Sequence, residues 1–274
     1  MKSRPLPADD LIDLAVLVAE ARAEYPHLRT LPVQLPDGRR AWLKVPQPAS
    51  VNCWHWLQTW LARLCDNPFL LPTVAVQAGE SLKGEARRIR KLAKLGFPVP
   101  RIIAEGADWL LLLDSGSPAT TVLRDQSHSR NHRVIQLQSI STLLAKMHQC
   151  GCWHGRPALK DVLCNEAEVT LCDFEEDVGA NLTPLQCQVR DALIYGHSLF
   201  RVFHRTDPEM ALQGLNAYWQ AAPPSVKNAT TDKVQSMDAL LSVDVFLGRY
   251  LGGDALAIFS SMRHFYTLSP SVVV

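Results

Sequence analysis

The segment from Met147 to Asp177 constrains the fold more than any other part of this chain of 274 residues. It contains two short runs of β-forming, apolar residues, 161–164 and 169–172, separated by a polar turn. A polar loop that begins at His154 precedes the first run, and an acidic cluster that begins at Asp173 follows the second. The pattern predicts two neighbouring strands that bring the polar loop and the acidic cluster close together.

The loop and the acidic cluster resemble the catalytic and metal-binding loops of the protein-kinase-like superfamily. The residues HGRPALKD, from His154 to Asp161, stand in place of the motif HxDxxxxN, and DFE at Asp173 stands in place of Asp-Phe-Gly. The resemblance implies that His154, Arg156, Asp161 and Asp173 form the catalytic set and that the two acids bind Mg²⁺. Arg156 occupies the position of the family's catalytic Asp.

Composition limits the possible partners. The chain has 28 basic and 27 acidic residues, a balance that argues against nucleic acid as a partner. It lacks the pattern of a signal peptide, and its longest apolar run, 109–113, is far shorter than the ~20 residues that span a bilayer. We therefore expect a cytoplasmic protein with no transmembrane segment, and peripheral contact with the inner membrane stays open.

Seven cysteines, an odd number, lie scattered within apolar segments. This distribution favours buried free thiols over a disulfide framework. Cys150 and Cys152 lie beside His154 and raise the alternative of a zinc site, but no second Cys or His pair follows at ligand spacing. We therefore do not expect zinc.

Periodic patterns predict further elements along the chain. Helices are expected at 9–25, 52–65, 81–95, 119–123, 131–149, 184–204, 209–221 and 233–250, and strands at 31–35, 39–45, 101–104 and 109–113. With the resemblance, these elements indicate an α+β, bilobal, protein-kinase-like fold. A small antiparallel-sheet lobe with a Glu-bearing helix would occupy residues 1–113, and a larger, mainly helical lobe 114–274. Three tryptophans in 52–65 suggest core packing more than a membrane-interface helix.

Lys44 and Glu85 are the candidate phosphate-binding pair of the small lobe. In kinase-like folds a Lys on the third strand pairs with the α- and β-phosphates of ATP, and the AWLKV run around Lys44 resembles that strand. Glu85 falls on the apolar side of its helix, where an acid needs a cation. Two alternatives stay open: Lys44 faces solvent, or Glu85 pairs on the helix surface with Arg88 or Arg90.

The segment after the Glu helix points to a branch of the superfamily. The run LGFPVPRII resembles the entry into the next strand in bacterial lipopolysaccharide-core sugar kinases, the Kdo and heptose kinases. Those proteins also carry a long insertion between the Lys strand and the Glu helix, as this chain does. The following Asp114-Ser-Gly116 stretch resembles the hinge between the lobes, which implies that Asp114 and Gly116 receive the adenine of ATP. Asp191, at the start of a later helix, is either a support of the catalytic loop or an exposed helix residue.

Two departures from the family pattern affect the expected activity. No glycine-rich loop precedes the Lys strand, and Arg156 cannot act as a general base because its guanidinium stays protonated. Arg156 could neutralise the transferring phosphoryl, hold an anionic acceptor, or mark a pseudokinase.

The resemblance implies an ATP- and Mg²⁺-dependent phosphotransferase. Its acceptor would be a small molecule or glycolipid: a hydroxyl of a sugar or of a lipopolysaccharide-type envelope intermediate. The alternatives are a small atypical Ser/Thr kinase with a protein substrate, and a nucleotide-binding pseudokinase that regulates a partner.

Overall fold

The computed structural model describes residues 8–46, 78–166, 168–175, 178–237 and 253–268. Two predicted elements fall wholly or largely outside these residues: the helix at 52–65 and most of the helix at 233–250.

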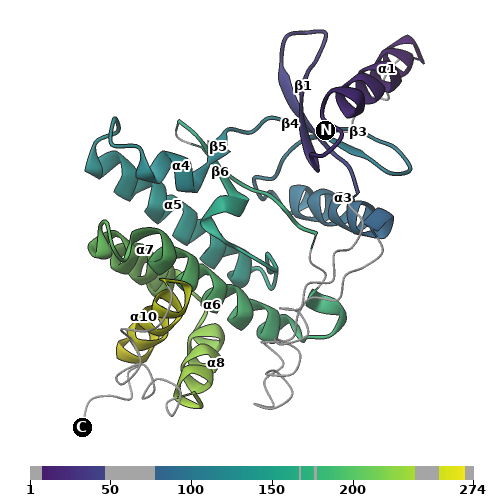
Figure 1. Cartoon of the computed structure of the whole chain (residues 1–274). Coiled ribbons are helices and arrows are strands. Elements are labelled where there is room, and N and C mark those ends of the chain that lie inside the picture. Colours follow the sequence, from purple (N-terminus) through teal and green to yellow (C-terminus); the bar gives the residue numbers. More distant parts are fainter. Residues whose placement is uncertain (1–7, 47–77, 167, 176–177, 238–252, 269–274) are drawn as a thin grey trace.

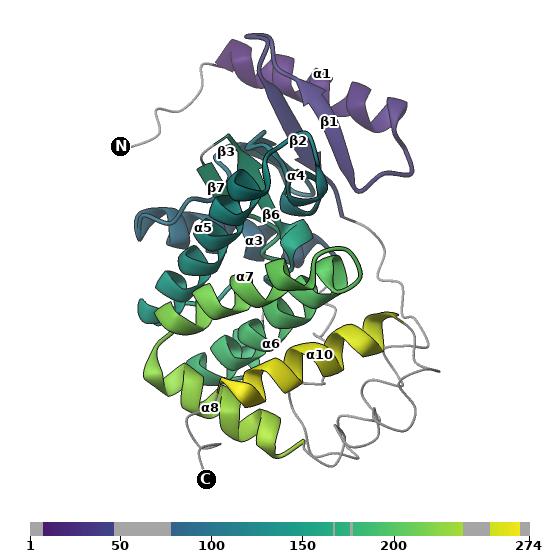
Figure 2. The same ribbon diagram turned by 90° about the vertical axis from the view of Figure 1, so that its left-hand side faces the viewer.

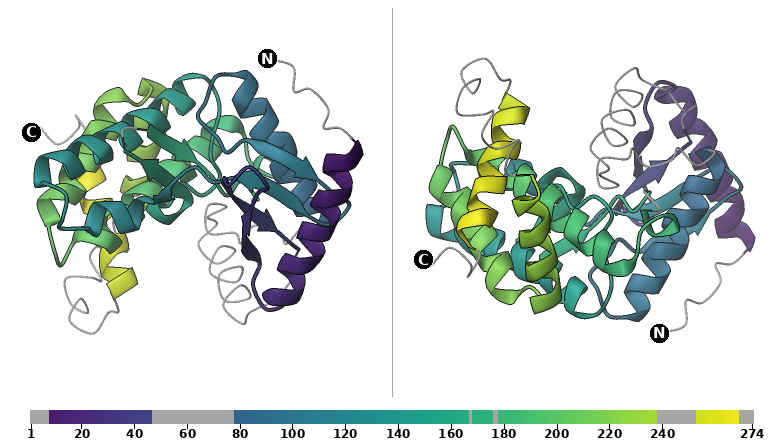
Figure 3. Two further views of the ribbon diagram at one scale, coloured as in Figure 1. Left: turned by 90° about the horizontal axis from the view of Figure 1, so that it is seen from above. Right: turned by 90° about the horizontal axis from the view of Figure 1, so that it is seen from below.

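A four-stranded antiparallel sheet forms the N-terminal part of the structure. Its strands are β1 (Thr30–Gln34), β2 (Arg40–Lys44), β3 (Ile102–Glu105) and β4 (Leu110–Leu113), in the order β1-β2-β4-β3. Helix α1 (Ala8–Glu24) packs on one face through a core shared with β1, β2 and β4. Helix α3 (Ala78–Lys94) belongs to the main core, with the alternate residues of β4. The sheet is therefore covered on both faces (Figures 1 and 3).

The alternation of side chains along β2 decides where Lys44 points. Ala41 and Leu43 are buried in the core under α1, so Trp42 and Lys44 project from the opposite face, because side chains alternate along a strand. The register places Lys44 opposite Thr30 on β1 and Leu110 on β4. Lys44 therefore extends from a central strand toward the side of the sheet on which α3 packs.

A second, three-stranded sheet carries the polar loop and the acidic cluster. Its strands are β5 (Ser117–Pro118), β6 (Val162–Asn165) and β7 (Glu168–Leu171), all antiparallel. A short 3-10 helix (Leu159–Asp161) precedes β6, so Asp161 lies just before the strand and not within it as predicted. The hairpin of β6 and β7 brings the polar loop and Asp173 to the same end, because Val162 pairs with Leu171.

The remaining described residues are mainly helical (Figure 2). They are α4 (Ala119–Arg124), α5 (Arg130–Gln149), α6 (Pro184–Phe203), α7 (Pro208–Ala221), α8 (Pro224–Gln235) and α10 (Gly253–Thr267), with a 3-10 turn at Val178–Ala180. Helix α8 begins at Pro224, nine residues before the predicted helix start at 233. Pro224 is compatible with the first turn of a helix, where no N–H partner is needed, and Val226 and Val234 are buried. Helix α10 has no counterpart among the predicted elements.

A buried polar network joins α5, α6 and α7. Ser141 bonds to the hydroxyl of Tyr195 at 2.7 Å, and His148 Nδ1 lies 2.9 Å from the hydroxyl of Tyr218. The other ring nitrogen of His148 lies 3.3 Å from Asp191 Oδ2. These bonds set the rotation of the three helices about their axes and place Asp191 at the edge of the helical core.

The architecture confirms the predicted α+β fold class, with a small antiparallel sheet, a Glu-bearing helix and a larger helical part. The five cysteines within the described residues are free, although Cys150 is exposed and not buried as predicted. In the described ranges no helix is both long and apolar enough to cross a bilayer.

Two helical glycines provide a test of this packing. A Cβ at Gly196 in α6 would lie 2.8 Å from the buried ring of Phe265 in α10, whereas a Cβ at Gly84 in α3 would meet nothing within 4 Å. We expect Gly196→Ala to lower the free energy of unfolding by about 1–3 kcal/mol through overpacking. Gly84→Ala is the matched control and should raise it by up to about 1 kcal/mol through helix propensity. Chemical denaturation measures both, and equal effects at the two sites would contradict the close approach of α6 and α10.

Candidate functional site

Lys44 lies at the centre of a buried cluster of charges. Its Nζ is 2.8 Å from both carboxylate oxygens of Glu85, 3.1 Å from Asp173 Oδ1 and 3.0 Å from Glu175 Oε1. Glu85 is fully buried, and its Oε1 also accepts the backbone N–H of Phe174 at 3.3 Å. Burial would lower the pKa of Lys44, but Glu85 and Asp173 outweigh it and raise that pKa above its usual value. Lys44 therefore stays charged.

The predicted contact between Lys44 and Glu85 is thus present, and both alternatives are wrong. Lys44 does not face solvent, because its side chain is only 10% exposed. Arg90 pairs with Glu105 at 2.8 Å, and Arg88 donates to the carbonyls of residues 153 and 154 at 2.9 Å. Glu85 is fully buried and contacts Lys44 and the Phe174 N–H, so the alternative of a pair on the helix surface is wrong.

The backbone of the polar loop is held from two sides. Asp191, fully buried on α6, accepts the N–H groups of His154 and Gly155, the second at 2.8 Å. Arg88 from α3 and Arg190 from α6 donate to carbonyl groups of the same loop. Gly155 has a φ of 100°, which suits glycine. Of the two alternatives for Asp191, support of the loop is confirmed and an exposed helix position is wrong.

His154 is a buried, neutral part of this loop. Its ring is 1% exposed and packs against Phe174 with 4.7 Å between centroids. Burial lowers the pKa of His154 to about 4, below the usual 6.5. Because the ring is enclosed, we infer that His154 positions the loop and does not touch a ligand.

Arg156 lies between the two acids that the sequence assigns to a metal. Its Nε is 3.3 Å from Asp161 Oδ2, and its Nη2 contacts Asp173 Oδ2. Burial raises the pKa of Asp161 to about 6, although Arg156 opposes the shift. Burial also raises the pKa of Asp173, but the charges of Lys44 and Arg156 outweigh burial and lower that pKa well below its usual range.

This arrangement has the oxygen ligands that Mg²⁺ prefers but does not fit the ion. Asp173 Oδ1 faces Lys44, both Asp173 Oδ2 and Asp161 Oδ2 face Arg156, and Asp161 Oδ1 lies 3.4 Å from Lys160 Nζ. All four oxygens thus face a basic side chain, whereas Mg²⁺ needs direct oxygen contacts at about 2.1 Å. Among the described residues no group of three or more His, Cys, Asp or Glu is placed to hold a metal.

Asp114 and Gly116 lie apart from this cluster. Asp114 Oδ1 accepts the N–H of Gly116 at 3.1 Å, and its backbone N–H bonds to the carbonyl of Arg40 at 3.0 Å. Arg40 begins β2 whereas Lys44 ends it, so the turn and the charged cluster lie at opposite ends of that strand. A Cβ at Gly116 would lie 2.3 Å from the carbonyl oxygen of Cys164, which explains the glycine.

Arg29 and Lys160 also belong to the cluster, although no sequence pattern predicted them there. Arg29 precedes β1 and pairs with Glu175, which also bonds to Lys44. Arg29 lies outside every motif, and Lys160 occupies a variable position within HGRPALKD, so their entry into the cluster depends on how the strands and the loop meet. With them, four basic side chains meet four carboxylates among the described residues.

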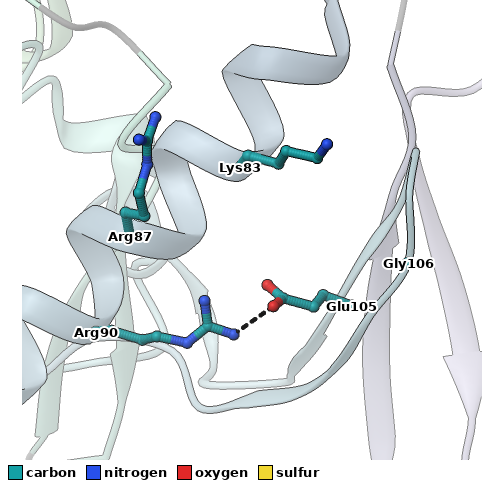
Figure 4. A pocket seen from close by; sticks show the side chains of 5 residues that line it. All are labelled: Lys83, Arg87, Arg90, Glu105 and Gly106. Carbon is teal, nitrogen blue, oxygen red and sulfur yellow. Dashed lines mark ion pairs between the residues drawn. The ribbon is translucent and has the colours of Figure 1, made fainter.

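A separate cavity of about 630 Å³ lies between α3 and the end of β3 (Figure 4). It is lined by Lys83, Arg87 and Arg90 from α3 and by Glu105 and Gly106 after it. Lys83 and Arg87 are exposed, whereas Glu85 between them is fully buried. This basic cavity and the cluster around Lys44 therefore lie on different faces of the helix, and no predicted site residue lines the cavity.

Comparisons with known proteins give distant relatives. No protein-family model matches the chain. An uncharacterised protein of Haemophilus influenzae is 25% identical over 165 residues, which cover 60% of each chain, so the match spans about three fifths of that relative's length.

Three solved structures align over most of the chain with TM-scores below 0.5. Macrolide 2'-phosphotransferase MphH from Brachybacterium faecium has 13% identity and a TM-score of 0.44, with 90% of this chain and 97% of that one covered. The pseudokinase domain of BIR2 has 12% identity and a TM-score of 0.42, with 100% of this chain and 89% of that one covered. The Rio2 kinase from Chaetomium thermophilum has 13% identity and a TM-score of 0.42, with 88% of this chain and 68% of that one covered. Likenesses this distant assign neither a family nor a function.

The buried state of His154 predicts a pH dependence of stability. Its pKa is about 4 in the folded chain and near 6.5 when unfolded, so the unfolded state binds more protons between these values. Above pH 6.5 the ring is neutral in both states, so His154 does not change the free energy of unfolding. As the pH drops from 6.5 toward 4, protonation of the unfolded state lowers the free energy of unfolding by about 3 kcal/mol for this group. His154→Phe should remove that part of the dependence. Urea denaturation of both proteins across this range measures the difference, and parallel pH profiles would contradict the buried, neutral ring.

The pair of Lys44 and Glu85 predicts non-additive stability effects. Lys44→Met leaves the carboxylate of Glu85 buried without its cation and should cost about 3–5 kcal/mol. Adding Glu85→Gln should recover much of this loss, because the uncompensated charge is gone. A double-mutant cycle by denaturation measures the coupling, and additive effects would show that the two side chains do not interact.

Proposed function

We propose that this chain is an ATP-dependent, kinase-like phosphotransferase. The observation that carries the proposal is the buried contact of Lys44 with Glu85 and Asp173, three residues that come from a sheet strand, a covering helix and the end of a hairpin. The sequence resemblance assigns Lys44 and Glu85 to phosphate binding and Asp173 to the neighbouring metal-binding loop. Their meeting in space supports that assignment because they are separated by 41 and 129 positions in the chain.

The side chains of the cluster suit the binding of phosphates. When bound, ATP would supply the phosphoryl group and the charge that the site must stabilise. Lys44 is held as a charged donor by Glu85, and the planar guanidinium of Arg156 matches the geometry of phosphate oxygens. Phosphoryl transfer depends mostly on positioning and on charge stabilisation, and both residues provide these. Asp114 and Gly116 would receive adenine from the other end of β2.

The acceptor that we propose is a hydroxyl of a sugar or of a lipopolysaccharide-type envelope intermediate. Support comes from the LGFPVPR segment after α3, which resembles the sugar kinases of the lipopolysaccharide core. A glycolipid acceptor would bring the chain into peripheral contact with the inner membrane. A Ser/Thr residue of a protein is the alternative acceptor.

A second candidate, a nucleotide-binding pseudokinase, is favoured by the position of Arg156. Its guanidinium cannot take a proton from an acceptor hydroxyl, and it contacts both acids of the cluster. Glu175, another acid of the loop, is paired with Lys44 and Arg29. A chain that binds ATP but transfers no phosphoryl group would match this candidate.

Binding and turnover measured on one pair of variants test the proposal. Lys44→Ala removes the central cation and should weaken ATP binding roughly 10- to 100-fold, as expected for the loss of a charged hydrogen bond. Lys146→Ala removes an exposed lysine of α5 and serves as the control, with no expected change. Calorimetry measures binding, and transfer of labelled γ-phosphate to Kdo- or heptose-bearing lipid A precursors measures activity.

The outcomes separate the candidates. Labelled product from the wild-type chain, lost in Lys44→Ala, supports the phosphotransferase. Binding without transfer to sugar, lipid or protein acceptors supports the pseudokinase. Equal binding by wild type and Lys44→Ala, or no binding by either, would refute a nucleotide site at Lys44.

A further inference from the structure

The guanidinium of Arg156 stands where a kinase-like site would hold its divalent cation. It contacts Asp173 through Nη2 and lies 3.3 Å from Asp161 Oδ2 through Nε. The remaining oxygens of the two acids face Lys44 at 3.1 Å and Lys160 at 3.4 Å. The charge that a metal would neutralise is therefore already balanced by side chains of the chain itself.

The loop around Arg156 keeps the guanidinium in this place. Asp191, Arg88 and Arg190 hold the backbone of the two preceding residues, so the side chain starts from an anchored position. Asp161 is 4% exposed, and removing its cation would leave a charge buried without compensation. A divalent ion must displace Arg156 before it can coordinate either acid, and that displacement opposes metal binding.

We propose that Arg156 replaces the divalent metal of this site, so that the chain excludes the ion from Asp161 and Asp173 and binds nucleotide phosphates without it. The proposal rests on the nucleotide site proposed above. About a third of the Arg156 side chain, 34%, is exposed, so phosphate oxygens that arrive from solvent can reach the guanidinium. Arg156 and Lys44 then bind the phosphates together, on either side of Asp173.

The first arm of the experiment compares nucleotide binding with and without metal. ADP is titrated calorimetrically into the wild-type chain in EDTA and in millimolar Mg²⁺. We expect dissociation constants that agree within about threefold, a difference below the 1.4 kcal/mol of one decade. Binding that requires Mg²⁺ would overturn the inference and leave the proposed function intact.

The second arm changes the residue itself. Arg156→Ala should weaken ADP binding in EDTA about tenfold or more, the effect of losing a charged hydrogen bond, and should make the remaining binding depend on Mg²⁺. Arg156→Lys keeps the charge but loses the planar fork, so we expect an intermediate affinity. Melting temperatures and circular dichroism confirm that each variant is folded. If Arg156→Ala binds as the wild type does in EDTA, the guanidinium does not hold phosphate.

The third arm measures the metal directly and needs no nucleotide. Mn²⁺ is titrated and followed by electron paramagnetic resonance, in which bound Mn²⁺ loses the signal of the free ion. The wild-type chain should bind no Mn²⁺ at the cluster, Arg156→Ala should bind one ion, and Arg156→Ala with Asp161→Asn should lose it again. Binding of Mn²⁺ by the wild type that disappears in Asp161→Asn would overturn the exclusion.

The arms distinguish this inference from the proposed function. If ADP binds neither in EDTA nor in Mg²⁺, the proposed nucleotide site is refuted, and the inference of metal-free nucleotide binding is refuted as well. The Mn²⁺ arm still decides whether Arg156 excludes the ion.

Discussion

The ion pair of Lys44 and Glu85 is the constraint on which the candidate site depends. A carboxylate with no exposed surface is costly unless it is paired, and Glu85 has Lys44 at 2.8 Å. The pairing requires β2 to present Lys44, and not Leu43, to α3, and it requires α3 to turn Glu85 inward. A buried pair adds little net stability compared with apolar residues of the same size. Its main effect here is to select one register and one helix rotation.

The second set of constraints comes from the helical part. Asp191 accepts two backbone N–H groups from the loop, and the same carboxylate lies 3.3 Å from His148 in the core of α5. His148 in turn bonds to Tyr218 of α7. The loop that carries Arg156 is thus attached to three packed helices, and Arg88 attaches it to α3 as well. The position of the partly exposed guanidinium of Arg156 is decided by residues deep in the core.

The balance of charges distinguishes this cluster from a site prepared for a metal. Four basic side chains and four carboxylates neutralise one another among the described residues, with Arg156 between Asp161 and Asp173. A phosphate-bearing ligand would compete with Asp173 and Glu175 for the two central cations, Lys44 and Arg156. Binding of such a ligand would therefore rearrange ion pairs within the cluster, and the competing carboxylates would lower its affinity.

The sequence by itself determined the local features: the β1 and β2 strands, the β6 and β7 strands, the face of β2 on which Lys44 lies, and the inward side of α3 on which Glu85 lies. These follow from turn chemistry and from the periods of strands and helices, which act over a few residues. The start of α8 and the existence of α10 did not follow, because their apolar patterns are weak and their helicity depends on packing against α6. Which cation pairs with Glu85, whether Asp191 is buried, and the entry of Arg29 and Lys160 into the cluster were decided only by the tertiary structure. So was the placement of Arg156 between two acids, because burial and distance between residues far apart in the chain exist only once the sheet and the helices have packed.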